Sequence, residues 1–307
     1  MESMASGFPD YTWEGKKLMP YLNQLREESY YFENIYSAGI HTNNSIVASL
    51  YGYPAFFERP MMPTEIIYHT GLPVNLKEQG YETLFFLTGN PNYDNMNQFL
   101  LGNGFNRIYS QYDYPKEEVV NNFGVSDQYL FEYGLEILDK TSRTGEPFLA
   151  TFLTVSNHPP LIIPEKFKEK GRSDQESILS YVDSTIEYFI ENAKKKDWFE
   201  NTLFILVGDH GKIIGEQPYE MSLTYNHVPL LFYSSEIQKN PRKFDQTGLQ
   251  IDIYPSIMEL LNISYTNNSL GESLFSHERP FGYFVSDTHV GCLDKELFYI
   301  YNPPYKR

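Results

Sequence analysis

Four apolar runs constrain the fold of this chain most strongly, because each has the length of a strand and is nearly continuous. Such runs are typical of strands that helices cover on both faces. Segments of helical pattern separate the runs, and this alternation predicts an α/β layered domain. The predicted strands are residues 81–87, 147–155, 203–207 and 228–233, and the predicted helices are residues 19–29, 92–103, 126–140, 173–196 and 252–261.

The last thirty residues have a different pattern. After Glu278 the chain contains two short aromatic segments, residues 281–285 and 297–301, which predict a small antiparallel appendage. We therefore expect a main domain over residues 1–275 and an appendage of the same domain over residues 276–307. No internal repeat or low-complexity linker interrupts the sequence.

Composition excludes several classes of function. The net charge of −16 and the pI near 4.9 disfavour nucleic acid as a partner, since its phosphates would be repelled. With Cys292 as the single cysteine, neither an internal disulfide nor a cysteine-rich metal site can form. No apolar stretch approaches the length of about 18 residues that a membrane-spanning helix needs.

Chemistry-bearing residues follow the third predicted strand directly. Asp209 and His210 stand between Gly208 and Gly211, just past the end of the strand, which is where α/β sheets present ligands. A carboxylate and an imidazole at one point favour a metal site, and the glycines permit a tight turn. The alternative interpretation is a turn aspartate next to a capping histidine.

The string V-G-D-H-G resembles the D-H-G signature of alkaline phosphatase-like enzymes, and other segments match the lipoteichoic acid synthase branch of that superfamily in the same order. Glu2 resembles the first metal-ligand motif, Thr42 within A-G-I-H-T-N-N-S resembles the nucleophile of phosphoglycerol and phosphoethanolamine transferases, and S-N-H-P-P at residues 156–160 resembles the N-H-x-P loop. The segments N-H-V-P-L at residues 226–230 and Q-I-D-I-Y-P-S-I at residues 250–257 resemble two further motifs.

The resemblance implies an alkaline phosphatase-like three-layer sandwich, with a mostly parallel central sheet between helices. It also implies that Glu2, Thr42, Asp209 and His210 hold one divalent ion, with Mn²⁺ expected first and Zn²⁺ or Mg²⁺ as alternatives. Metal coordination would make the Thr42 hydroxyl nucleophilic, giving a phospho-threonine intermediate. Thr42 as an ordinary helix N-cap is a compatible alternative.

Four further residues are expected to bind substrate. By resemblance, His158 and His227 contact the phosphoryl group or protonate the leaving alcohol. Asp94 and Asn95 are candidate contacts to the head group. The tryptophan and arginine that hold glycerol phosphate in lipoteichoic acid synthases are absent from residues 93–97, so specificity for glycerol phosphate does not follow.

The resemblance therefore predicts a metal-dependent phosphotransferase or hydrolase that acts on lipid-linked phosphoryl head groups of the phosphoglycerol or phosphoethanolamine type. It implies a phosphorylated lipid or glycan substrate and a place at the membrane, on its extracytoplasmic face, and it leads us to expect that the family's first strand and its membrane helices are missing from this chain. A non-catalytic module that binds envelope glycan or lipid is the alternative. A sulfuric ester hydrolase is disfavoured, because Cys292 lies outside any C-x-P-x-R site.

Overall fold

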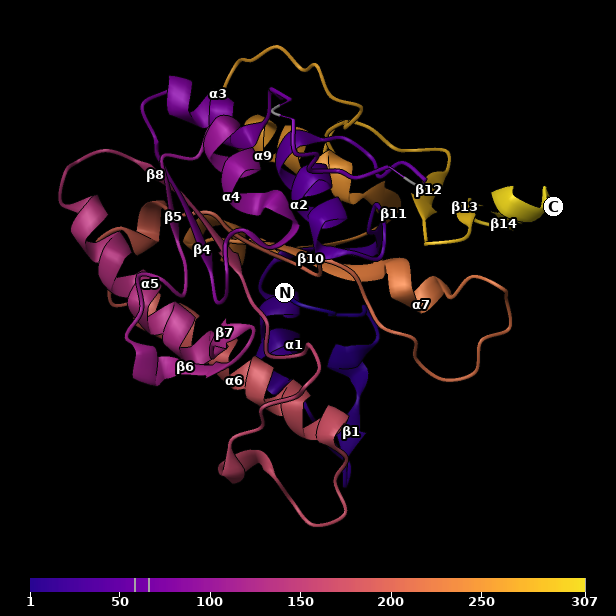
Figure 1. Cartoon of the computed structure of the whole chain (residues 1–307), viewed down its shortest axis with the longest axis horizontal. Coiled ribbons are helices and arrows are strands. Elements are labelled where there is room, and N and C mark those ends of the chain that lie inside the picture. Colours follow the sequence, from indigo (N-terminus) through magenta and orange to yellow (C-terminus); the bar gives the residue numbers. More distant parts are fainter. Residues whose placement is uncertain (58, 66, 307) are drawn as a thin grey trace.

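The computed structural model describes residues 1–57, 59–65 and 67–306, and it has three layers. Strands form the middle layer, with helices above and below them (Figure 1). One sheet contains β5 (Arg107–Tyr109), β4 (Glu82–Leu87) and β8 (Phe148–Leu153) in that order, and all its pairs are parallel. The second contains β11 (Arg242–Leu249), β3 (Tyr30–Tyr36), β10 (His227–Tyr233) and β9 (Phe204–Val207). The predicted layered arrangement is confirmed.

Strand β10 departs from the parallel pattern. It is antiparallel to both β3 and β9, whereas β11 is parallel to β3. The chain reaches β10 from β9 through a loop and the short helix α7 (Leu223–Asn226), without a covering crossover helix. Parallel neighbours are usually joined by a crossover helix that covers the sheet, and the chain between β9 and β10 forms no such helix.

Helices cover both faces of the strands. One face carries α2 (Thr42–Tyr51), α3 (Leu72–Glu78), α4 (Met96–Gly102) and α9 (Ile253–Leu260), and the other carries α1 (Pro20–Glu27), α5 (Asp127–Ser142) and α6 (Asp174–Ala193) (Figure 1). Side chains alternate between the two cores: Leu230 and Phe232 lie in one, Leu231 and Tyr233 in the other. This explains why β10 is apolar at consecutive positions from Val228 to Tyr233.

The strand β11 was not predicted, and its composition explains why. Its sequence, RKFDQTGL, is exposed or half-buried over the first five residues, because β11 is an edge strand. Edge strands commonly carry charged side chains that discourage further pairing. The remaining short elements are β1 (Thr12–Trp13), β2 (Lys16–Lys17), β6 (Val119–Asn121), β7 (Gly124–Val125) and α8 (Ser235–Gln238).

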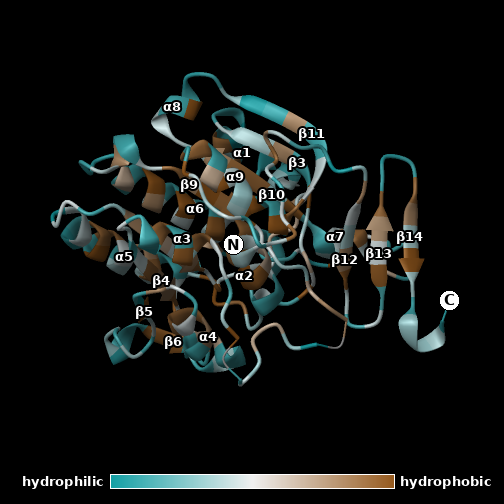
Figure 2. Ribbon diagram, turned by 90° about the horizontal axis from the view of Figure 1, so that it is seen from above, coloured by the Kyte–Doolittle hydropathy of each residue, from teal (hydrophilic) through white to brown (hydrophobic). Residues whose placement is uncertain are grey.

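A small antiparallel sheet lies at the C-terminal end, to one side of the main layers (Figure 2). It contains β12 (Gly282–Val285), β13 (Val290–Leu293) and β14 (Phe298–Tyr301), so a third strand joins the two that were predicted. The sheet is tied to the main domain where the Val285 amide donates to the Ala38 carbonyl at 3.0 Å. Across the described residues, none of the helices combines the length and the apolar character needed to span a bilayer.

Candidate metal and phosphoryl-transfer site

The expected metal ligands meet where β8 and β9 end. Residues 1 and 2 lie between these strands: the Glu2 amide donates to Thr154 Oγ1 at 3.0 Å, just past β8, and the Asp209 amide donates to the Met1 carbonyl at 3.0 Å, just past β9. Each strand is at one edge of its own sheet. The site therefore lies at the junction of the two sheets.

Asp209 is held by its neighbours through one carboxylate oxygen. Its Oδ1 accepts hydrogen bonds from the amides of Ser3 at 2.8 Å and His210 at 2.7 Å. Its Oδ2 accepts from the Thr42 hydroxyl at 3.1 Å, and the residue is only 4% exposed. One oxygen thus fixes the orientation of the carboxylate, while the other faces the site.

His210 has one ring nitrogen engaged by the backbone. Its Nδ1 lies 2.8 Å from the Gly211 carbonyl, which can only accept, so Nδ1 carries the hydrogen. In the neutral imidazole, Nε2 then has the free lone pair that a metal ligand requires. The same Nε2 lies 3.7 Å from Asp209 Oδ2.

The two glycines around this pair are needed for a reason other than the predicted tight turn. A side chain on Gly208 would collide with the Met4 carbonyl, and one on Gly211 would collide with the Thr224 carbonyl. Close approach of backbone segments therefore requires glycine here.

Glu2 brings a second carboxylate into the buried cluster. It is 5% exposed, and its Oε1 accepts a hydrogen bond from the Ser3 hydroxyl. Burial raises the pKa of Glu2 well above its ordinary value, and the neighbouring Asp209 carboxylate raises it further. Two buried carboxylates side by side are costly unless a cation or proton compensates them.

Thr42 is the first residue of α2 and sits at the rim of this cluster. The N-cap is His41, so the alternative in which Thr42 is the N-cap is wrong. His41 Nε2 pairs with Asp287 Oδ1 at 2.7 Å, on the turn between β12 and β13. The C-terminal sheet therefore reaches the residue next to Thr42.

These side chains fit a divalent cation. Ligand atoms of Glu2, Asp209 and His210 all lie within 4.8 Å of one another, and in the described ranges of the chain this is the one such group of three or more His, Cys, Asp or Glu residues. Two carboxylates offset the charge of the ion, the imidazole adds a nitrogen, and the Thr42 hydroxyl lies beside them. This mixed oxygen and nitrogen set suits Mn²⁺ or Zn²⁺ better than Mg²⁺.

His158 lies on the loop after β8. Its Nδ1 is 2.6 Å from the Pro159 carbonyl, and its ring contacts Phe123 with centroids 4.4 Å apart. The adjacent Asn157 is 1% exposed and donates to the Ser3 carbonyl at 2.9 Å. The loop that carries His158 is thus bonded to the turn that carries Glu2.

His227 contacts strand β3 and is not one of the residues grouped around Asp209. Its Nε2 donates to the Glu33 carbonyl at 2.7 Å, and its ring stacks on Tyr36 with centroids 5.1 Å apart. Burial lowers the pKa of His227, which favours the neutral ring. These contacts give His227 a packing role, and its predicted contact with substrate stays a prediction.

Asp94 and Asn95 occupy a turn before α4 in which both have positive φ, 50° and 60°. Asp94 Oδ2 accepts from the Asn43 amide group at 3.1 Å, which places Asp94 beside the residue that follows Thr42. Asn95 instead donates to the Pro63 carbonyl at 2.6 Å and so anchors a neighbouring loop. Of the two predicted head-group contacts, Asp94 is the one bonded to the residue that follows Thr42.

Tyr225 is a site residue that the sequence did not reveal. Its ring centroid lies 5.5 Å from that of His210. Burial raises the pKa of its hydroxyl, and so do the nearby carboxylates of Asp287, Glu2 and Asp209. No motif marked this tyrosine, because one tyrosine among 26 carries no signal of its own.

Lys212 is a second such residue. Its ammonium group donates to the Asn157 carbonyl at 2.6 Å, to Asn157 Oδ1 at 2.9 Å and to Gln175 Oε1 at 3.1 Å. Burial lowers its pKa, while the carboxylate of Glu2 acts in the opposite direction. Lys212 follows the D-H-G segment directly, and that position was the available signal.

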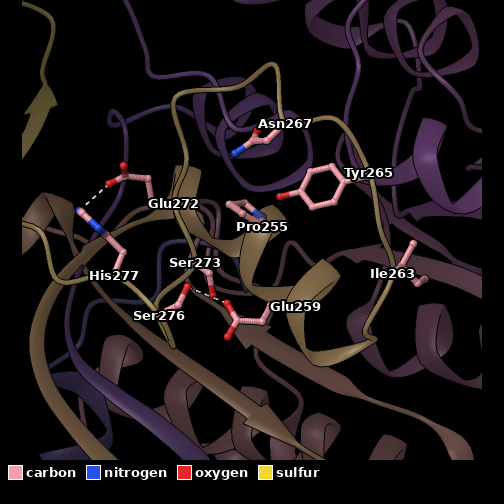
Figure 3. Close-up of a pocket in the computed structure, with 9 residues that line it drawn as sticks. All are labelled: Pro255, Glu259, Ile263, Tyr265, Asn267, Glu272, Ser273, Ser276 and His277. Atoms are coloured by element: carbon pink, nitrogen blue, oxygen red, sulfur yellow. Dashed lines mark hydrogen bonds and ion pairs between the residues drawn. The ribbon is translucent and has the colours of Figure 1, made fainter.

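The structure also contains a pocket elsewhere. Its volume is about 390 Å³, and it lies between α9 and the segment that follows it, where Glu259, Tyr265, Glu272 and His277 line it (Figure 3). Its carboxylates are paired locally, Glu272 with His277 at 2.7 Å and Glu259 with the Ser276 hydroxyl at 2.9 Å. None of the predicted site residues lines this pocket.

Several known proteins are similar to this chain in sequence. The family model described as Sulfatase matches residues 1–263. Lipoteichoic acid synthase 2 of Bacillus subtilis (strain 168) is 24% identical over 331 residues, covering 94% of this chain and 49% of its own length. Lipoteichoic acid synthase of Staphylococcus aureus (strain USA300) is 25% identical over 302 residues, which cover 85% of this chain and 44% of the synthase. The chain spans about half the length of the curated relatives it matches.

Solved structures confirm the predicted fold. A protein in the alkaline phosphatase superfamily from Vibrio parahaemolyticus has a TM-score of 0.87 and 28% identity, covering 98% of this chain and 75% of its own. A lipoteichoic acid synthase from Listeria monocytogenes has a TM-score of 0.80 and 19% identity, and the match covers 98% of this chain and 83% of the synthase structure. The three-layer arrangement is therefore alkaline phosphatase-like.

Proposed function

The chain belongs to the sulfatase family and is an enzyme domain of the sulfatase and phosphotransferase kind, and we propose that it cleaves phosphodiester bonds with Thr42 as the nucleophile. One observation carries the proposal. The Thr42 hydroxyl lies 3.1 Å from Asp209 Oδ2, beside the buried group of Glu2, Asp209 and His210. A hydroxyl next to a set of metal ligands is the arrangement that nucleophilic catalysis by threonine needs.

We propose that Glu2, Thr42, Asp209 and His210 hold one divalent ion, Mn²⁺ in the first place. When bound, such an ion lowers the pKa of a hydroxyl and stabilises charge on a phosphoryl group. The N-terminus of α2, which begins at Thr42, also favours a bound anion through the positive end of the helix dipole.

In the proposed reaction, the Thr42 oxygen forms a bond to phosphorus as its proton is lost to solvent. The bond from phosphorus to the leaving alcohol breaks, and that oxygen takes up a proton, for which His158 is the proposed donor. The oxygen of an acceptor hydroxyl or of water then bonds to phosphorus and loses its proton, while the bond from phosphorus to the Thr42 oxygen breaks and that oxygen takes up a proton. The enzyme is a transferase if an alcohol accepts the phosphoryl group, and a hydrolase if water accepts it.

The relatives that carry the name lipoteichoic acid synthase suggest the substrate class. We propose a lipid-linked phosphoglycerol or phosphoethanolamine donor at the extracytoplasmic face of the membrane, with Asp94 beside the head group. Sulfate ester hydrolysis has less support, because a threonine occupies the nucleophile position and Cys292 lies on β13 of the C-terminal sheet.

The proposal is tested by incubating the purified chain with Mn²⁺ and either a p-nitrophenyl phosphodiester or fluorescent phosphatidylglycerol. We expect turnover by the wild type and by Thr266→Ala, a change at an exposed position, and a loss in Thr42→Ala. Mass spectrometry of the acid-quenched reaction is expected to find a phosphoryl adduct on Thr42. Turnover that persists in Thr42→Ala refutes the nucleophile, and a wild type without ion binding or turnover supports the non-catalytic binding module.

A further inference from the structure

We infer that Gln250 is a positioning residue that fixes the metal ligand Asp209 relative to the helix that begins with Thr42; this inference rests on the proposed function. Gln250 is 0% exposed and opens the short turn Gln250–Asp252 between β11 and α9. No motif of metal ligands or nucleophiles includes it. Its importance lies in the partners of its side-chain amide.

The amide nitrogen of Gln250 contacts both segments of the site. Nε2 lies 2.8 Å from the Gly208 carbonyl, 2.8 Å from the Asp209 carbonyl and 2.9 Å from Ser45 Oγ. The first two belong to the loop of metal ligands. Ser45 belongs to α2, three residues after Thr42, and residues three apart are neighbours on a helix surface.

The amide oxygen adds a third attachment. Gln250 Oε1 accepts a hydrogen bond from the Ala38 amide at 3.0 Å, on the loop that leads from β3 into α2. One buried side chain thus bonds to the loop before α2, to the first turns of α2 and to the backbone of Asp209. These segments lie on the two sides of the 3.1 Å contact between Thr42 and Asp209.

The chemistry of glutamine suits this position closely. Two N–H hydrogens face three acceptors, so they are shared, and a shift of either segment weakens at least one bond. Glutamate would place a carboxylate against the Gly208 and Asp209 carbonyls, and asparagine would be one methylene shorter. Methionine has a similar length but donates no hydrogen bond, so it removes the attachment while filling the space.

The test compares Gln250→Met with Gln246→Met as a matched control. Gln246 lies on β11, and its amide bonds to the Leu274 carbonyl, away from the metal cluster. For each protein we would measure the unfolding midpoint without metal, the Mn²⁺ affinity by titration calorimetry and the electron paramagnetic resonance spectrum of bound Mn²⁺. The kcat and KM for a p-nitrophenyl phosphodiester complete the set.

For Gln250→Met we expect the Mn²⁺ affinity to fall about 10-fold or more, the range that partners behind metal ligands commonly show. The Mn²⁺ spectrum should broaden and kcat should fall with little change in KM, because ground-state binding of substrate is not what Gln250 supports. Gln246→Met should keep the wild-type spectrum, affinity and kcat. A folded Gln250→Met protein with wild-type spectrum, affinity and kcat overturns the inference.

If Gln250→Met does not fold, the variant Ser45→Ala tests the inference in its place. This change removes only the link from Gln250 to α2, and alanine is favourable in a helix. We expect kcat to fall more than Mn²⁺ affinity, and a wild-type kcat and spectrum in Ser45→Ala would overturn the inference. A wild type that binds no Mn²⁺ defeats the proposed function and the inference together, whereas normal wild-type binding with unaffected variants defeats the inference alone.

Discussion

Replacing Glu2 by glutamine is expected to stabilise the protein without metal while abolishing its response to Mn²⁺. Ligand atoms of Glu2 and Asp209 lie within 4.8 Å of each other, and both side chains are about 95% buried. With an effective dielectric constant of about 20, two unit charges at 4.8 Å repel by about 3 kcal/mol. Glutamine removes this repulsion but weakens the hydrogen bond from Ser3, which costs about 1–2 kcal/mol.

The expected net gain is therefore about 1–2 kcal/mol in the free energy of unfolding. This gain in the free energy of unfolding increases with pH, for the following reason. Burial and the Asp209 carboxylate raise the pKa of Glu2 above 4.5 in the folded protein, so folded wild type binds a proton more readily than unfolded wild type. Wild-type stability from this group is present below pH 4.5 and is lost as pH rises through the raised pKa. The advantage of Glu2→Gln thus grows as pH rises above 4.5 and is larger at pH 8 than at pH 5.

The assay is urea unfolding in EDTA at pH 8 and pH 5, followed by tryptophan fluorescence and repeated with Mn²⁺ at pH 8. Ion binding at 100 times its dissociation constant stabilises a folded protein by about 2.7 kcal/mol, so wild type should gain by this order and Glu2→Gln should not. Glu146→Gln, at an exposed position, is the control. A Glu2→Gln protein that is less stable than wild type at pH 8 without metal, or that Mn²⁺ still stabilises fully, refutes the reasoning.

Three further predictions concern residues around the site. Asp252→Asn should destabilise the fold by about 3 kcal/mol, measured by urea unfolding, because the Arg279 guanidinium would lose the carboxylate that accepts from its Nε at 2.7 Å. The kcat of the folded fraction should not change, and a lost kcat would contradict this structural role. His227→Gln should cost about 1 kcal/mol with kcat and KM unchanged, whereas a raised KM would support substrate contact instead. Asp94→Ala should raise KM with little effect on kcat, and an unchanged KM for every head group tested would exclude Asp94 from binding.

The sequence predicted those parts of the protein that local patterns encode. Strands covered on both faces, such as β4 and β10, contain nearly continuous apolar runs, and Asp209 and His210 lie just past the end of such a strand. The order of the motifs predicted that Glu2 and Thr42 belong to the same site as Asp209, and in the structure both lie next to Asp209. The edge strand β11 escaped prediction because half-buried polar residues give no strong period.

The tertiary structure decided the role of each polar side chain, because that role depends on partners distant in sequence. His158 and His227 stand in similar motifs, yet only the fold shows that the His227 ring is bonded to Glu33 and stacked on Tyr36. The sequence does not show which groups the Gln250 amide bonds to. Gln250 links two segments of the site only when β11, α2 and β9 come together in the fold. Sequence by itself determined which chemical groups are present and which strands end near them. Their distances, orientations and buried charges arise only from packing, since hydrogen bonds and electrostatic interactions act over a few ångströms of space, whatever the separation along the chain.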